Sequence, residues 1–436
     1  MAMKTSIPAA AIRSARARHT GFGLVELMIS VAIGLVILAA LVALFVNASR
    51  NNREMASANS VIENGRFAIE LLETDIVHAG YWGTYVPDFD DPTLGEAVPT
   101  STPAAVPDPC VDYDAAEWVT GSDLVNSLVG IPVQVFDGDT PVCAGVVEDR
   151  VPGTDVLVLR HAERCLPGAG DCEDDDPANP GLFVQASTCA EEAEDTPYAF
   201  GRTGVEPFDL TQRDCATLAD KRRFMSSLYY VRDYAAAPGD GIPTLVRSEF
   251  GLDGGTLAHQ EPVPLIEGID GLWVELGVDD VSITGDPVDN AAAVVWEDEE
   301  TKQRATNRGD GIPDGDFVRC TNAVPCELDQ LMNVTAVKVY VLARSRDATR
   351  GYTDTKSYTV GLAGDVAAFG DGFKRHVYST TVRLHNVAGR RIRPGLEEVL
   401  EAGGGEPDPD PDPVVEPFPD PVDPVVPIDP VVPEAL

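Results

Sequence analysis

Cysteine and histidine are the residue types of this chain that could form cross-links or hold a metal. The sequence of 436 residues contains eight cysteines, spread between positions 110 and 326, and six histidines. An even number of cysteines suits a disulfide framework, whereas zinc sites need closely spaced pairs of cysteine or histidine. The sequence has no CxxC pair and no paired histidine spacing. We therefore predict disulfides, and we expect neither a metal nor a cofactor.

The favoured disulfide pairing joins cysteines that are neighbours along the chain. The sequence alone leaves the connectivity open. The preferred pairs are Cys110–Cys143, Cys165–Cys172, Cys189–Cys215 and Cys320–Cys326. The last pair closes a short and isolated loop, so the spacing supports it most.

An acidic, glycine-rich loop at residues 307–316 is a further candidate for ion binding. Its sequence NRGDGIPDGD resembles the second half of a calcium loop, with Asp310, Asp314 and Asp316 as oxygen donors. Ca²⁺ suits such loops because it takes about six to eight oxygens in a flexible geometry. The loop lacks acids at Thr306 and Arg308, where a full motif would place them. A solvated turn is therefore favoured over a calcium site.

Motifs that would indicate an enzyme are missing from the sequence. It contains no P-loop, no nucleophile elbow, no HExxH zinc motif and no Rossmann fingerprint. Scattered serine, histidine and aspartate residues indicate no catalysis without a defined geometry. We therefore expect a structural or binding protein and not an enzyme.

The charge of the chain excludes one class of partner. It has 71 acidic and 32 basic residues, for a net charge of −39. Direct binding of nucleic acid needs basic patches that displace counterions from phosphates. The acidic balance instead suits a solvated surface outside the cytoplasm.

The N-terminal 46 residues have the pattern of a membrane anchor. Residues 1–21 carry four basic residues and no acid, and the 20 residues 27–46 contain Ser30 as their only polar member. As a helix, that run would extend about 30 Å, the thickness of one hydrocarbon core. Basic residues before the run and an acidic chain after it place the N-terminus in the cytoplasm. A plain signal anchor would have the same pattern.

Glu26 stands at the head of this run, where an ionised side chain is costly. The stretch GFGLVEL (21–27) resembles the cleavage motif of type IV prepilins. That resemblance implies that a prepilin peptidase cuts after Gly21 and that Phe22 becomes the N-methylated first residue. Glu26 would then be the fifth residue and would pair with the charged amine of a Phe22 during assembly, because a buried charge is retained when it is paired. Gly23 departs from the commoner Thr or Ser at the second position.

Residues 47–80 continue the helix as an amphipathic segment. No proline interrupts the chain from Phe22 to Gly80, which is the expected helix stop. Apolar residues step by three and four, as on one face of an α-helix. They are Met55, Ala58, Ile62, Gly65, Ile69, Leu72 and Ile76.

Later segments alternate with period two, which predicts strands with one face on a core. The clearest are residues 272–278, 337–344 and 378–384, and long polar insertions separate the expected strands at 84–125, 163–222 and 280–330. A long N-terminal helix followed by strands predicts an α+β protein in which the helix packs on an antiparallel sheet.

Several segments resemble the PilW group of type IV pilus-assembly proteins, which are large minor pilins. They include ENGRFAIELLETDIVHAGYWG (63–83), GTDVLVLRHA (153–162), SLYYVRDYAAAPGDGIPTLVR (227–247), PLIEGIDGLWVELGVD (264–279), VTAVKVYVLARSR (334–346) and DGFKRHVYSTTVRLHN (371–386). The resemblance runs in order from about residue 21 to residue 390, and it implies a type IV pilin-like fold with large loop insertions.

The expected organisation has five parts. They are a prepilin leader (1–21), a transmembrane half-helix (22–46), an amphipathic half-helix (47–80), a periplasmic β-rich domain (81–400) and a tail (401–436). The tail is rich in proline and aspartate, and repeated proline removes backbone donors. We expect it to be disordered or a semi-rigid spacer.

The resemblance implies a minor pilin that takes part in priming pilus assembly, sits in a tip complex and supports pilus biogenesis and twitching motility. Its partners would be other minor pilins, the major pilin, the prepilin peptidase and the inner-membrane assembly platform. It would span the inner membrane once, with its C-terminal domain in the periplasm, and then reach the pilus and cell surface. The alternatives are a type II secretion pseudopilin and a pilin-anchored surface adhesin.

Overall fold

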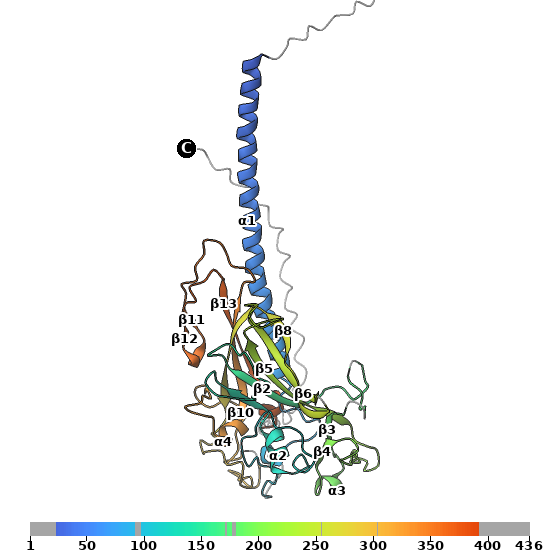
Figure 1. Cartoon of the computed structure of the whole chain (residues 1–436). Helices are drawn as coiled ribbons and strands as arrows, with labels where there is room; N and C mark the ends of the chain where they lie inside the picture. Colours follow the sequence, from blue (N-terminus) through green and yellow to red (C-terminus); the bar gives the residue numbers. More distant parts are fainter. Residues whose placement is uncertain are drawn as a thin grey trace, which may run out of the picture.

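A single long helix projects from a β-rich domain (Figure 1). The computed structural model describes residues 23–91, 97–170, 172–176, 180–253, 255–302 and 304–391. The helix α1 (Leu24–Ile76) comes first, and antiparallel strands make up most of the remainder. The expected α+β fold with a pilin-like N-terminal helix is therefore confirmed. The leader, the cleavage site and the tail lie outside the described residues.

The helix α1 is continuous because nothing in its sequence breaks the backbone hydrogen-bond pattern. It ends at Ile76, four residues before the expected stop, and the chain then turns through residues 77–80. Gly80 adopts a φ of +75°, a left-handed conformation that glycine reaches without strain. Its N–H donates to the carbonyl oxygen of Arg160 at 3.0 Å, so this glycine directs the chain onto the sheet.

The face of α1 that the domain buries differs from the expected stripe. Met55 and Ile62 belong to that stripe, yet they are 65% and 47% exposed. The buried residues are Val61, Gly65, Ala68, Leu72 and Ile76. The helix is thus rotated toward its smaller side chains, because these allow closer approach to the sheet.

Three strands form the sheet on which α1 packs. They are β9 (Ile269–Val278), β10 (Val334–Arg344) and β13 (Arg375–Arg383), in the order β13-β10-β9, all antiparallel. Val339 on the central strand lies opposite Thr380 on one side and Val274 on the other. These strands coincide with the three alternating segments of the sequence.

The larger sheet has eight strands, all paired antiparallel. They are β1 (Val133–Phe136), β2 (Val156–Ala162), β3 (Leu182–Ala186), β4 (Tyr198–Arg202), β5 (Lys221–Arg232), β6 (Thr244–Asp253), β7 (Thr256–His259) and β8 (Val263–Glu267). The order is β1-β2-β5-β3-β4, and β6 pairs with β5, β7 and β8. Residues 163–222 were expected to be an insertion between strands, but they contribute β3 and β4 to this sheet.

Short elements complete the domain. They are α2 (Asp123–Gly130), α3 (Ala190–Ala193), α4 (Leu328–Met332), α5 (His385–Arg391), the 3₁₀ turns η1 (Asp88–Asp90) and η2 (Gly361–Ala363), and the hairpin β11 (Tyr358–Thr359) with β12 (Asp365–Val366). The main core lies among α1, the three-stranded sheet and the larger sheet, with Leu72, Val339 and Leu159 fully buried. A second, aromatic core surrounds Trp118 and Phe224.

A buried arginine joins the upper ends of β9 and β13 to the loop between β10 and β13. The Arg375 side chain is 1% exposed and its Nε lies 2.5 Å from the carboxylate of Asp270. Its Nη1 lies 2.9 Å from Asp354 and 2.7 Å from Asp371, both in that loop. One cation therefore joins the start of β9 to the start of β13 and to the loop that precedes it.

The last described helix returns to the end of α1. The side-chain amide of Asn386 in α5 donates to the carbonyl oxygen of Val77 at 3.0 Å. Arg390 donates to the carbonyl oxygen of Gly80 at 2.5 Å. The first and last elements of the described chain are thus hydrogen-bonded to each other.

Candidate functional site

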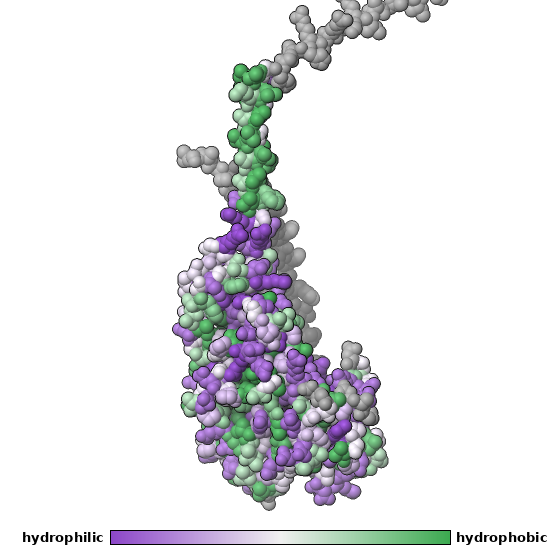
Figure 2. All heavy atoms as spheres, in the orientation of Figure 1, coloured by the Kyte–Doolittle hydropathy of each residue, from purple (hydrophilic) through white to green (hydrophobic). Residues whose placement is uncertain are grey.

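The N-terminal half of α1 is a helix without a protein partner in this single chain. Helix α1 is long and apolar enough to cross a membrane, and no residue of its most apolar window is buried by the domain. Figure 2 shows this half as a hydrophobic rod, followed by a hydrophilic band where α1 approaches the domain. A rod of this length and composition is suited to crossing a membrane.

Glu26 lies in the first turn of this rod. Gly23 precedes the helix in an extended conformation, and no side chain caps the helix N-terminus. The Ser30 hydroxyl donates to the backbone carbonyl oxygen of Glu26 and leaves the carboxylate unoccupied. The positive end of the helix dipole favours an acidic side chain at this position. Within the described residues, the carboxylate is exposed and available to a partner outside the chain.

Gly65 allows the lower half of α1 to touch β13. A Cβ atom added at this position would lie 2.1 Å from Cε2 of Tyr378, closer than any real contact. The tyrosine ring therefore occupies the space that a side chain at position 65 would need. The sequence analysis placed Gly65 on the apolar face, and the structure gives the reason for the glycine.

Replacing Gly65 with alanine is expected to destabilise the protein by about 1–3 kcal/mol, the usual cost of overpacking. The change also raises helix propensity by about 1 kcal/mol, which offsets part of that cost. Gly389→Ala is the matched control, because it adds the same methyl group to a helical glycine with no atom within 4 Å. Thermal unfolding of the full chain in detergent measures both. Equal Tm values for the two variants would contradict the close contact.

A polar cluster fastens the end of α1 to the larger sheet. His161 Nε2 on β2 lies 3.0 Å from the Asp75 carboxylate, and the Tyr229 hydroxyl on β5 donates to the same carboxylate at 2.9 Å. Burial opposes ionisation of Asp75, but its contacts with His161 and Tyr229 outweigh burial and lower its pKa. Burial likewise disfavours the His161 cation, but the bond to Asp75 prevails and raises its pKa.

This cluster was not predicted from the sequence, because its members are far apart in the chain. Asp75 and His161 are separated by 86 residues. One signal was present in the sequence: Asp75 is an acid directly beside the apolar Ile76. A carboxylate next to the buried face of a helix needs a partner when the helix packs.

The stabilisation from the Asp75–His161 pair is expected to depend on pH. Because the folded-state pKa of His161 is raised, its contribution is fully present below the unfolded pKa of about 6.5 and is lost as pH rises through the folded value. His161→Gln should therefore cost about 1–2 kcal/mol near pH 6 and much less near pH 9. Tm values of both proteins across this range measure the difference.

The other groups near the pair that titrate or carry charge are His78, Glu163 and Arg247. The wild type and His161→Gln both contain these groups, so their effects on the Tm largely cancel when the two proteins are compared. A Tm difference that does not change with pH would contradict the raised pKa of His161.

The loop at residues 307–316 is built around Asp279. The Asp279 carboxylate accepts hydrogen bonds from the N–H groups of Asp310 and Gly311, and Arg391 lies 2.9 Å from it. The Asp314 carboxylate accepts from the N–H of Val281 at 2.8 Å. Within the described residues, Asp310, Asp314 and Asp316 do not gather into a group of three metal ligands. The cation in contact with the Asp279 carboxylate is thus the side chain of Arg391.

The potential metal ligands that do gather are Glu163, Cys165 and Cys172. The two cysteines are joined as a disulfide. Metals bind the thiolate form of cysteine, so this group fits a cross-link and not a metal site.

All eight cysteines form disulfides within the chain. The pairs are Cys110–Cys143, Cys165–Cys172, Cys189–Cys215 and Cys320–Cys326, the neighbour pairs that the sequence favoured. Cα–Cα separations are 5.4, 6.3, 5.0 and 4.9 Å in the same order, within the usual range of about 4.4–6.8 Å. Disulfides of this number are typical of proteins that fold in oxidising compartments.

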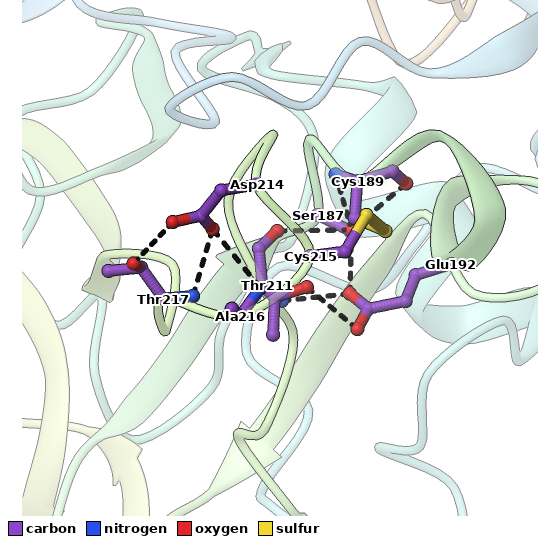
Figure 3. Close-up of a disulfide and its surroundings, with 8 residues drawn as sticks. All are labelled: Ser187, Cys189, Glu192, Thr211, Asp214, Cys215, Ala216 and Thr217. Carbon is purple, nitrogen blue, oxygen red and sulfur yellow. Dashed lines mark hydrogen bonds between the residues drawn. A yellow bond between two sulfur atoms is a disulfide. The ribbon is translucent and has the colours of Figure 1, made fainter.

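The Cys189–Cys215 disulfide organises the end of the domain farthest from the exposed half of α1 (Figures 1 and 3). Beside it, the Glu192 carboxylate accepts hydrogen bonds from the Thr211 N–H and hydroxyl, each at 2.8 Å, and from Ser187. The Asp214 carboxylate likewise accepts from backbone and side chain of Thr217. These bonds lower the pKa values of Glu192 and Asp214 and hold the loop in one conformation.

Two segments of the chain match family models. Residues 228–386 match the model described as Type IV Pilus-assembly protein W, and residues 16–42 match the Prokaryotic N-terminal methylation motif. No curated protein matches the chain. Among solved structures, the Type IV-like pilin TTHA1219 from Thermus thermophilus is similar, with 13% identity over 54% of this chain and 79% of that chain. Its TM-score is 0.21, which is too low to support an argument.

Proposed function

We propose that this chain, a member of the Type IV Pilus-assembly protein W family, is a minor pilin that primes pilus assembly and stays in a complex at the pilus tip. The observation that carries the proposal is an exposed apolar half-helix with Glu26 in its first turn, joined rigidly to a disulfide-bonded domain. The chemistry is structural: the helix packs, and the domain supplies lateral contacts.

The anchor would work in two environments. Before assembly, lipid would cover the apolar half of α1, with the domain in the periplasm. After extraction, the helices of neighbouring pilins would cover the same residues. Glu26 would set the axial position by pairing with the N-terminal amine of a neighbouring subunit, since a buried charge needs a partner. Support for pilus biogenesis and twitching motility would follow.

Processing at the N-terminus is the first test of this role. Cleavage after Gly21 by a prepilin peptidase, followed by N-methylation, predicts a peptide that begins at Phe22 with one added methyl group. Mass spectrometry of sheared fibres and membranes from the native host would look for it. Its presence at trace level in fibres is the expected result. A chain found only in membranes and still carrying residues 1–21 would overturn the proposal in favour of a plain signal anchor.

A surface adhesin with a pilin-type anchor is the second candidate. The ordered, disulfide-closed loop at Cys189–Cys215 favours it, because loops on a rigid scaffold often bind ligands. Deletion of the gene separates the two candidates. Normal pilus numbers with lost attachment to surfaces would indicate the adhesin, whereas lost pili would indicate the assembly role.

A further inference from the structure

Strand β13 is the outer strand of the three-stranded sheet. It pairs with β10 on one side, and no described strand pairs with its other side. The strand is nine residues long and contains no proline and no bulge in its pairing with β10. Natural proteins usually protect such an edge, because its free N–H and C=O groups can pair with another chain.

The hydrogen-bond pattern shows which residues of β13 face outward. The N–H of Leu384 donates to Thr335, and the N–H of Ser345 donates to Lys374, which identifies the pairs that bond across the two strands. In an antiparallel ladder these pairs alternate with pairs whose backbone groups point away from each other. By this alternation, the backbone groups that point away from β10 belong to Val377, Ser379 and Thr381.

This edge is open to solvent beside α1. The side chains of Ser379 and Thr381 are exposed. A groove of about 230 Å³ lies between the edge and α1. It is lined by Arg66, Ile69, Glu70 and Glu73 of α1 and by Tyr378 and Ser379 of β13. An added strand would place alternate side chains into this groove.

We propose that β13 accepts a β-strand from the globular domain of a neighbouring pilin subunit whose anchor lies parallel to α1. The proposal rests on the proposed function, because it needs a neighbour held in the same membrane or fibre. Backbone hydrogen bonds to residues 377, 379 and 381 supply binding, and the groove selects the side chains of the incoming strand.

The direction of β13 argues against a second copy of this chain paired through the same edge. Tyr378 contacts Gly65 and Asn386 bonds to Val77, so β13 runs in the same direction as α1. Two β13 edges related by a two-fold axis pair antiparallel. Their α1 helices would then point in opposite directions, and two such anchors cannot enter one membrane from the same side.

The chain's own tail is also a poor occupant. Residues 406–433 read EPDPDPDPVVEPFPDPVDPVVPIDPVVP. Proline lacks the N–H that a paired strand must donate, so a segment with proline at every second to fourth position cannot complete a ladder.

Proline substitutions test the edge. Thr381→Pro removes one outward N–H that no described group accepts, and edge positions tolerate proline. We expect the wild-type Tm in detergent and an approximately tenfold lower amount of chain in sheared fibres, equivalent to about 1.4 kcal/mol. Ser379→Pro should behave alike. Thr381→Val, which keeps the N–H, is the matched control and should enter fibres like the wild type.

The internal position Thr380 makes the test decisive. Its N–H belongs to a pair that bonds β10, so Thr380→Pro should lower the Tm. A similar fall for Thr381→Pro would show that its N–H is bonded within the domain and would overturn the proposal. Folded Thr381→Pro and Ser379→Pro proteins at wild-type levels in fibres would overturn it as well. If even the wild type is missing from fibres, the assembly role itself fails.

Discussion

Replacing Arg375 with methionine is expected to lower the free energy of unfolding by about 3–5 kcal/mol, because it leaves the buried Asp354 without a cation and Asp270 with Arg344 alone, 3.6 Å away. Asp270 and Asp354 are 5% and 0% exposed at their side chains, and Arg375 contacts both. Methionine fills similar space but supplies no charge and no donor. For a domain of this size, the expected fall in Tm is about 6–10 °C.

Thermal unfolding of the full chain in detergent, with disulfides intact, measures the effect of Arg375→Met. Lys374→Met is the matched control, because the neighbouring lysine is partly exposed and makes no ion pair among the described residues. It should change the Tm by about 1 °C or less, in line with surface substitutions. A similar small change in both variants would mean that the three aspartates are satisfied without the arginine.

Replacing Glu26 with glutamine is expected to reduce the chain in fibres by about tenfold or more, since a lost charge pair in a nonpolar surrounding costs at least about 1.4 kcal/mol. The domain lies far from this residue along α1, so its Tm should not change. Processing after Gly21 should still occur, because Glu26 lies outside the bond that is cut. The variant should therefore accumulate, cleaved, in the membrane.

Quantitative mass spectrometry of fibres and membranes from the same cells measures this partition. Glu54→Gln is the control, because Glu54 is an exposed glutamate on the same helix beyond the apolar half. It should leave the amount in fibres unchanged. Wild-type levels of the Glu26 variant in fibres would mean that the carboxylate does not set the position of the subunit.

Local sequence patterns predicted the parts of the fold that depend on local physics. The unbroken apolar run predicted the exposed half of α1, and alternation at residues 272–278, 337–344 and 378–384 predicted β9, β10 and β13. The family resemblance supported the same arrangement. Strand β3 is buried on both faces, so its sequence does not alternate between apolar and polar residues. It also lies between acidic loops, and residues 163–222 were therefore predicted to be an insertion.

Contacts between residues that are far apart in the chain could not be predicted from the sequence. The Arg375 cluster joins residues from 270 to 375, and nothing in either segment marks them as partners. The pair of Asp75 and His161 depends on how β2 meets the end of α1. The rotation of α1 that exposes Ile62 follows from the tyrosine ring against Gly65, which only the packed structure reveals.

The hydrogen bonds between α5 and the end of α1 have a mechanical consequence. In the proposed role, tension on a pilus would pull on the subunit along α1, and load would pass to the domain through the buried face of α1 and through residues 77–80. There, Asn386 and Arg390 of α5 donate hydrogen bonds to the carbonyl oxygens of Val77 and Gly80, just after α1. Because β13 runs parallel to α1, the pull shears its ladder with β10 instead of peeling it one bond at a time. Load shared across many bonds in shear makes forced unfolding slow. The proposed place in a pilus would require this property.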